Sequence, residues 1–302
     1  MPYRIRPDRP FREEVVSVGC EQLQRAIASL EDQPQGVHEA IHEARKKFKR
    51  VRSLYRLVAL DQKDWRTAEN IRLRDAARTL SVVRDATALI ETIVYLDNHA
   101  LNDDERTALS QARSALTARR DTLALAETDL PAKVDAAVSA CREAIASLET
   151  ASFPNSPRKA AKLLGKGWKK GLARGRTALE ECHRSVHEEV FHDLRKATQA
   201  YWMNLSLLRD VWPSAMHAKR AEAKRLVDTL GHEHDLALLV DLLDRESGLI
   251  GGETFSHLLG AIIRQQQELR RAALELAQEV FAETPARESM IIETLWLAAA
   301  TE

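Results

Sequence analysis

The stretch HEAIHEARKKFKR, residues 38–50, could support two different kinds of chemistry. His38 and His42 lie one helical turn apart with Glu39 beside the first. In a zinc-protease helix this spacing lets two imidazoles bind the metal while the glutamate acts as a general base. The last six residues contain five Lys or Arg and one Phe, which is typical of a polyanion-binding surface. Because a metal dication and a cluster of cations repel each other, the two patterns compete as explanations.

An internal repeat decides between the two patterns. Shifting the sequence by 150 residues aligns four polar residues of the first half with identical residues of the second: His42 with His192, Arg45 with Arg195, Lys46 with Lys196, and Asp85 with Asp235. The same shift places Glu188 opposite His38, so the first histidine of the zinc pattern is not repeated. No third zinc ligand is evident on a neighbouring predicted helix. The repeated unit is therefore H-x-x-R-K, and we expect neither a metal nor another cofactor.

Helical geometry gives the H-x-x-R-K segment two different faces. At about 100° per residue, one stripe about 120° wide collects six residues. They are His42, Arg45, Lys46, Lys49, Arg52 and Arg56. Another face collects Ala44, Phe48, Val51, Tyr55 and Val58, which we expect to pack in the core. Residues 42–56 contain seven Lys or Arg but only one acid, Glu43. An ordinary solvated face would mix charges of both signs, so the stripe is a candidate ligand-binding surface.

A second cationic segment, residues 158–176, carries eight Lys or Arg and no acid. Its candidate ligand-binding residues are Lys166, Lys169, Lys170, Arg174 and Arg176. Glycines within it lower helix propensity but would allow close approach by a polyanion or by another helix. The alternative is that this segment is a basic linker between the two halves.

The next predicted helix of each half adds further polar candidates. Arg74 and Arg78 share a face with Ser81 and Asp85 in the first half, and Lys224 belongs to the second half. We expect the two aspartates, Asp85 and Asp235, to pair with arginines of the preceding helix and to fix the guanidinium orientation. A metal role for these aspartates is weaker, and the His-Asp dipeptides of the second half lack the full ligand set of a phosphohydrolase of the HD type.

The elements that must position these residues are helices throughout. Segments rich in Ala, Leu, Arg and Glu, with apolar residues spaced by three and four, alternate with Gly and Pro punctuation. The predicted helices cover residues 11–30, 35–61, 64–98, 103–127, 131–150, 158–182, 185–211, 214–246, 253–282 and 286–300. We expect an all-α protein formed by tandem duplication, with one antiparallel helical bundle in residues 1–150 and a homologous one in residues 151–302.

Composition limits the functional class. Lys and Arg total 45, as do Asp and Glu, so the formal net charge is zero, which disfavours a general nucleic-acid coat. Three cysteines without metal-binding spacing fit a reducing compartment. No run approaches the roughly 20 apolar residues that a membrane-spanning helix needs, and the N-terminus lacks the apolar core of a signal peptide. We expect a soluble, cytoplasmic protein without a membrane partner.

The doubled motif resembles one known family. A helix with H-x-x-R-K-x-x-K-R-x-R, followed by a helix with L-S-x-x-R-D and repeated at 150 residues, is similar to the conserved-histidine α-helical domain, or CHAD, family. The residues that carry the resemblance are His42, Arg45, Lys46, Lys49, Arg50, Arg52, Arg56, Leu80, Ser81, Arg84 and Asp85, with His192, Arg195, Lys196, Leu230, Gly231, His234 and Asp235 in the second copy. The resemblance implies two bundles related by a pseudo-twofold axis, with basic residues between them.

The resemblance also implies a ligand. Family members bind inorganic polyphosphate and can localise to polyphosphate granules, so we expect a non-enzymatic polyphosphate-binding protein. In the second copy Gln199, Trp202 and Ser206 replace Lys49, Arg52 and Arg56, which makes that stripe less cationic. Two alternatives stay open: a nucleic-acid-binding helical module, which the composition disfavours, and a metal-dependent polyphosphate phosphohydrolase or phosphotransferase in which His42 and His192 transfer protons. The neighbouring Arg-Lys pairs should lower the pKa of both histidines.

Overall fold

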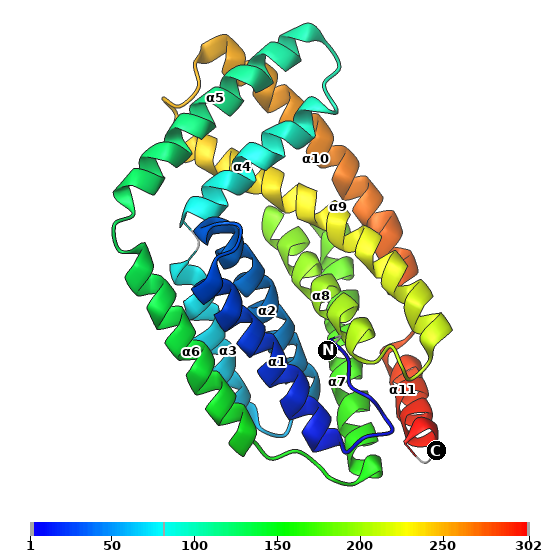
Figure 1. Cartoon of the computed structure of the whole chain (residues 1–302). Helices are drawn as coiled ribbons and strands as arrows, with labels where there is room; N and C mark the ends of the chain where they lie inside the picture. The colour runs from blue at the N-terminus through cyan, green and yellow to red at the C-terminus, as the bar shows by residue number, and fades with distance from the viewer. Residues whose placement is uncertain (1–2, 81, 301–302) are drawn as a thin grey trace.

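A computed structural model describes residues 3–80 and 82–300, and all the regular structure in these two ranges is helical (Figure 1). This confirms the predicted all-α class. The helices are α1 (Phe11–Asp32), α2 (Val37–Val58), α3 (Lys63–Thr79), α4 (Val82–Asp97), α5 (Asp103–Ala126), α6 (Leu130–Thr150), α7 (Pro157–Arg184), α8 (Glu188–Leu207), α9 (Pro213–Arg245), α10 (Gly252–Val280) and α11 (Pro285–Ala299). Within the described ranges, no helix is both long and apolar enough to cross a membrane.

The helices form three neighbouring groups. Helix α2 packs on α1 and α3, and α6 covers α1 and α3 from the other side. Helix α7 packs on α8 and α11, and α8 in turn packs on α9. At the end of the molecule drawn uppermost in Figure 1, α4 and α5 cross the ends of α9 and α10. Helix α2 also contacts both α7 and α8, so the two basic segments predicted from the sequence lie against each other.

Equivalent helices of the two halves occur in the same order. Helix α2 (Val37–Val58) corresponds at the 150-residue shift to α8 (Glu188–Leu207), and α5 (Asp103–Ala126) corresponds to α10 (Gly252–Val280). Their contacts correspond as well, because α1 packs on α2 and α6 much as α7 packs on α8 and α11. The order and the neighbours of these helices are thus alike in the two halves of the chain.

One predicted helix is wrong. Residues 64–98 were expected to form a single helix, but α3 ends at Thr79 and α4 begins at Val82. Ser81, which the sequence analysis places on one face with Arg74, Arg78 and Asp85, lies outside the described residues. Leu73 and Leu80 pack in one hydrophobic cluster, whereas Leu89 and Ile93 pack in another. The two parts of this segment therefore belong to different cores, although the equivalent α9 serves both cores as one unbroken helix.

Both hydrophobic cores contain residues from both halves of the chain. The larger core includes Phe48 and Tyr55 of α2 together with Trp168 of α7. The smaller core joins α4 and α5 to α9 and α10. The apolar face predicted for α2 is confirmed, since each of its five members is at most 1% exposed. Burying this face fixes the direction in which the opposite, cationic face of α2 must point.

The basic segment 158–176 is part of a 28-residue helix, so the linker interpretation is wrong. Trp168 and Leu172 of α7 are each 1% exposed and anchor it in the larger core. Gly167 lies where α7 meets α2, and a Cβ atom added there would collide with the backbone carbonyl of Leu57. The glycine therefore permits close approach of a neighbouring helix, which is one of the two uses expected from the sequence.

Trp65 links helix α3 to both of its neighbours, α2 and α6. The Trp65 ring packs edge-on against Tyr55 of α2, with 4.9 Å between ring centroids, and against Phe153, at 6.2 Å. Its indole nitrogen donates a hydrogen bond to Ser147 Oγ of α6 at 2.9 Å. This anchor sets the distance between α3 and α2, and with it the width of the space between α3, α2 and α7.

Candidate polyanion-binding groove

Two adjoining pockets open where α2, α3, α7 and α8 meet. The larger has a volume of about 350 Å³ and the smaller about 240 Å³. Arg52, Arg56 and Ala200 line both pockets, so the two form one continuous depression, which we call the groove. Where α2 and α8 cross, Ser53 Oγ donates a hydrogen bond to Asn204 Oδ1 at 3.2 Å and joins the two helices at the groove.

All the charged residues that line the groove are positive. Neither lining contains Asp or Glu. The cations of the larger pocket are Arg52, Arg56, Arg66, Arg74, Lys170 and Arg174, and the smaller pocket adds Lys49, Arg195 and Lys196. The neutral polar residues Thr67, Asn70, Gln199 and Asn204 complete the hydrogen-bonding surface. Such a surface attracts anions and repels metal cations.

Loss of hydration lowers the pKa values of four of these cations, Lys49, Arg52, Arg56 and Arg195, and repulsion between cations adds to the effect for the first three. Loss of hydration in the groove, followed by repulsion from Arg195 and Arg45, lowers the pKa of Lys49 to about 8, although part of the Lys49 side chain stays in contact with solvent. Loss of hydration and repulsion from Arg52 lower the pKa of Arg56 to about 10. The pKa values of Arg52 and Arg195 are lowered chiefly by loss of hydration. A bound polyanion would relieve this repulsion.

Comparison with protein-family models places the chain in a known family. A family model described as the CHAD domain matches residues 21–244, which is most of the chain and includes α2, α3, α7 and α8. The chain belongs to the CHAD domain family.

One solved structure shares the CHAD fold seen here. PptA from Streptomyces chartreusis aligns with a TM-score of 0.58 and 15% sequence identity, covering 91% of this chain and 100% of that chain. At this identity the likeness concerns the fold. No curated protein matches the sequence.

The groove of this CHAD chain brings together eight of the residues that the sequence selected. These are Lys49, Arg52, Arg56, Arg74, Lys170, Arg174, Arg195 and Lys196. Arg66 was missed, although it lies four and eight residues before Asn70 and Arg74 on the same helical face and could have been found from that spacing. Two of the cations are already paired at exposed positions: Arg74 with Asp75 at 2.9 Å and Lys196 with Asp193 at 2.9 Å.

The other members of the α2 stripe lie outside the two pocket linings. Lys46 forms an ion pair with Glu43 at 2.6 Å, so this lysine is neutralised locally, contrary to the sequence expectation. Arg45 forms an ion pair with Asp85 at 3.3 Å, which is the type of pairing expected for that aspartate. Arg45 is half-buried, and one of its terminal nitrogens makes no hydrogen bond within the described structure.

His42 is half-buried, and its Nδ1 accepts a hydrogen bond from Arg84 Nε at 3.1 Å. Arg84 belongs to the family motif in the sequence but is not among the predicted site residues. The pKa of His42 is lowered, first by loss of hydration and then by Arg84 and Lys46. The pKa of His192 is also lowered, by loss of hydration and then by Lys196 and Arg195. The predicted direction is confirmed for both histidines, but burial is the larger cause.

His192 packs against a second histidine. The rings of His192 and His234 stack with 4.6 Å between centroids, and Nδ1 of each ring is buried without a hydrogen-bond partner among the described residues. Burial, followed by repulsion from Arg195 and from His192, lowers the pKa of His234 to about 3. Asp235 lies close enough to Arg195 to interact electrostatically with it, while burial raises the pKa of this carboxyl group.

Five further predicted cations, beyond Arg45 and Lys46, lie outside both pocket linings. The Arg176 guanidinium donates hydrogen bonds to the carbonyl oxygens of Phe281, Ala282 and Glu283 at 3.2–3.3 Å, which closes the end of α10. Lys224 pairs with Asp228 and lies 6.0 Å above the Trp202 ring. Arg78, Lys166 and Lys169 are exposed on α3 and α7. Of these five, Arg176 has a clear structural role.

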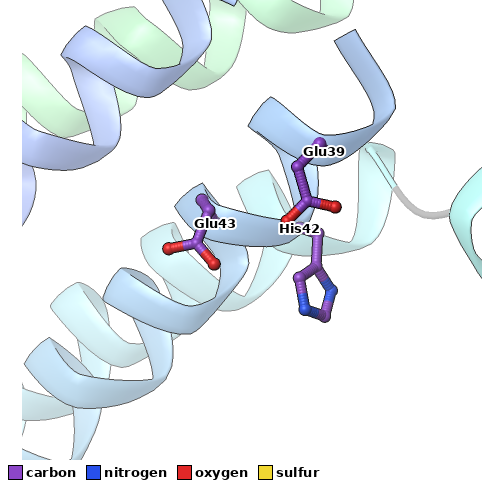
Figure 2. A group of neighbouring side chains, drawn as sticks. All are labelled: Glu39, His42 and Glu43. Atoms are coloured by element: carbon purple, nitrogen blue, oxygen red, sulfur yellow. The ribbon is translucent and has the colours of Figure 1, made fainter. Parts of the chain in front are cut away.

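A cluster of possible metal ligands lies on the first turns of α2. Glu39, His42 and Glu43 bring ligand atoms within 4.8 Å of one another (Figure 2). The zinc pattern in the sequence pairs His38 with His42 instead. Glu43 already pairs with Lys46 and with Lys47 at 3.0 Å, and His42 receives the Arg84 hydrogen bond. Three cations therefore surround this cluster and oppose a metal dication there.

Proposed function

We propose that this protein binds inorganic polyphosphate in the groove. The observation that carries the proposal is that nine Lys and Arg residues line the groove while no Asp or Glu does. Polyphosphate carries about one negative charge per phosphate and has no base edges, so its recognition needs spaced cations more than shape-specific contacts. Arg residues supply paired hydrogen bonds to phosphate oxygens, and Lys residues supply mobile point charges.

The layout of the groove favours a polymer over a single phosphate. Its two pockets are continuous through Arg52 and Arg56, so the cations of the smaller pocket, which include Lys49 and Arg195, adjoin those of the larger pocket, which include Arg66 and Arg174. Helices α2 and α3 come from the first half of the chain and α7 and α8 from the second. A ligand in the groove would therefore contact both halves, which we propose to be duplicated bundles related by a pseudo-twofold axis.

We further propose that the protein binds polyphosphate without transforming it. The residues that line the two pockets include no Asp, Glu, His or Cys, which are the usual general acids and bases and the usual metal ligands. Binding without reaction would suit a cytoplasmic protein that associates with polyphosphate granules. Nucleic acid is the weaker ligand in this proposal, since none of the lining residues is aromatic and bases would have no stacking surface.

A titration series tests the proposal. The full-length chain is titrated with tripolyphosphate, with polyphosphates of increasing defined length and with single-stranded RNA, at matched ionic strength. Affinity per molecule should rise with chain length until the groove is filled, and polyphosphate should displace bound RNA. Incubation with Mg²⁺ should release no phosphate. Preferential RNA binding would support a nucleic-acid module, and phosphate release would support a phosphohydrolase.

A further inference from the structure

Lys49 is the only lysine that lines the smaller pocket from α2, and it shares that pocket with a set of guanidinium groups. Arg52, which comes three residues after Lys49 on α2, lines both pockets, and Arg195 lines the smaller pocket from α8. Lys49 is exposed to solvent while it lines this pocket. The pocket volume of about 240 Å³ accommodates a small phosphorylated molecule.

We propose that Lys49 is a self-acylation site, at which the amine accepts an acyl group from a small acyl phosphate bound in the smaller pocket. The phosphate group of the donor would contact Arg52 and Arg195, which places its carbonyl carbon near Lys49 Nζ. Nothing beyond the acyl phosphate itself is needed as a reactant.

The reaction balances as an acyl transfer. The lone pair of the neutral Lys49 amine attacks the carbonyl carbon, and the tetrahedral intermediate collapses by breaking the bond between that carbon and the bridging oxygen. The bridging oxygen leaves with the electron pair as inorganic phosphate, and the amine loses one proton to solvent. Nearby guanidinium groups stabilise both the oxyanion of the intermediate and the leaving phosphate. The product is an uncharged amide at Lys49.

The surroundings of Lys49 supply the neutral amine that the reaction requires. With its pKa lowered to about 8, about a tenth of Lys49 is unprotonated at pH 7, whereas an ordinary lysine is almost fully charged. Loss of hydration is the largest cause of this shift, and the charged groups that act with it come from four helices: Arg45 on α2, Asp85 on α4, Arg195 on α8 and Asp235 on α9. His234 on α9 is also near Lys49 but, with its pKa at about 3, is uncharged. The two arginines favour the neutral amine, and the two aspartates partly oppose them.

Acylation would also change the groove. It would remove one positive charge from the smaller pocket and place an amide where a phosphate would otherwise bind, so affinity for polyphosphate should fall. This regulatory consequence rests on the proposed polyphosphate function, whereas the acylation itself does not. Bound polyphosphate should in turn block the acyl phosphate from the pocket and protect Lys49.

The experiment incubates the full-length chain with acetyl phosphate and follows each lysine by mass spectrometry over time. Lys159, which is exposed on the first turn of α7 and outside both pocket linings, is the internal control. Lys49 should be acetylated roughly tenfold or more faster than Lys159 on the basis of its larger neutral fraction. Equal or slower acetylation of Lys49 would overturn the proposal, whatever the polyphosphate titration shows.

Two further arms separate the pocket from simple amine reactivity. With an uncharged acetylating ester, the preference for Lys49 over Lys159 should shrink, since such a donor gains nothing from the cations. In Arg195→Gln, which removes both a phosphate contact and a repulsive neighbour, the preference with acetyl phosphate should fall severalfold. An unchanged preference in both arms would show that the pocket does not bind the donor, and would overturn the proposal. Acetylated wild type should bind polyphosphate more weakly, while treated Lys49→Arg should not change.

Discussion

Arg84 Nε donates a hydrogen bond to Nδ1 of His42 at 3.1 Å. A guanidinium group has donors only, so Nδ1 must act as the acceptor, and the proton of the neutral ring lies on Nε2. Protonation of Nδ1 would break this hydrogen bond and place two positive charges in contact. The neutral form of His42 on α2 therefore holds Arg84 of α4 in place.

The first prediction concerns stability against pH. The pKa values of His42, His192 and His234 are all lowered in the folded protein, so the unfolded chain binds more protons below about pH 6.5. The stabilising contribution is complete above that pH and is lost as the pH falls. The Tm should therefore drop between about pH 7.5 and pH 5.5. His42→Gln can still accept the hydrogen bond from Arg84 but cannot be protonated, so its Tm should drop less over this pH range. The control His217→Gln, at an exposed position, should lose as much Tm as the wild type. Parallel curves for all three proteins would contradict this account.

The second prediction concerns the groove charges. Replacing Lys49, Arg52 and Arg56 together with alanine should weaken polyphosphate binding at least roughly hundredfold, because each charge-assisted contact contributes about 1.5–3 kcal/mol. The slope of log affinity against log salt should become shallower as well, since fewer counterions are released, by analogy with nucleic-acid binding. The matched control replaces three exposed arginines at the other end of the molecule, Arg106, Arg113 and Arg245. Equal losses in both triple variants would mean that net charge, and not the groove, governs binding.

The third prediction separates two arginines on one helix. Arg174 lines the larger pocket, whereas Arg176 donates to three carbonyl oxygens after the end of α10. Arg174→Ala should weaken polyphosphate binding and leave the free energy of unfolding nearly unchanged. Arg176→Ala should lower that free energy by about 1–3 kcal/mol, the usual cost of hydrogen bonds to a charged group, with little effect on binding. Denaturant unfolding and calorimetric titration of both variants measure the two effects, and the reverse pattern would refute the assignment.

The fourth prediction concerns the crossing of α7 and α2. Gly167→Ala should destabilise the fold by about 1–3 kcal/mol, because its Cβ would collide with the Leu57 carbonyl and backbone cannot move aside easily. Gly171→Ala is the control on the same helix: its Cβ would lie 3.8 Å from Asn204 Nδ2, an ordinary contact. This change should be neutral or stabilising by up to about 1 kcal/mol through helix propensity. Thermal and denaturant unfolding measure the free energy of unfolding of both variants. Similar losses of stability in the two variants would mean that α7 and α2 can move apart to accommodate the Cβ at position 167.

The fifth prediction concerns protons taken up on binding. A polyanion next to Lys49 should raise its pKa from about 8, so the complex binds more protons than the free components. Affinity should therefore increase as the pH falls through about 8. Calorimetry in buffers of different ionisation enthalpy should detect uptake near that pH in wild type. Lys49→Arg, which keeps the charge, should take up fewer protons; undiminished uptake would assign the protons to another group.

Much of the arrangement around the groove followed from local pattern. The spacing of Phe48, Val51 and Tyr55 fixed which face of α2 is buried, and hence that Lys49, Arg52 and Arg56 face away from the core. This inference works because the direction of a side chain around a helix depends only on its position in the sequence. The repeat at 150 residues likewise predicted that α8 would carry a second, weaker version of the same face.

The break between α3 and α4 could not be obtained in this way. Residues 64–98 and 214–246 have similar helical patterns, yet one is interrupted after Thr79 and the other continues. The difference depends on which core each turn packs against, and α4 packs with α5, α9 and α10 in the smaller core. Such packing involves partners far away in the sequence, so helix propensity and hydrophobic periodicity cannot predict it.

The sequence by itself determined the helical class, the family, the repeat and the faces on which cations gather. Only the tertiary structure decided which of these cations act together: Arg66 and Arg174 line one pocket, while Arg176 closes a helix and Lys46 is paired with Glu43. The physical reason is that helical periodicity fixes the direction of a side chain but not its neighbours across the helix interface. Charge pairing and loss of hydration depend on those neighbours, and these two effects separate a binding groove from an ordinary charged surface.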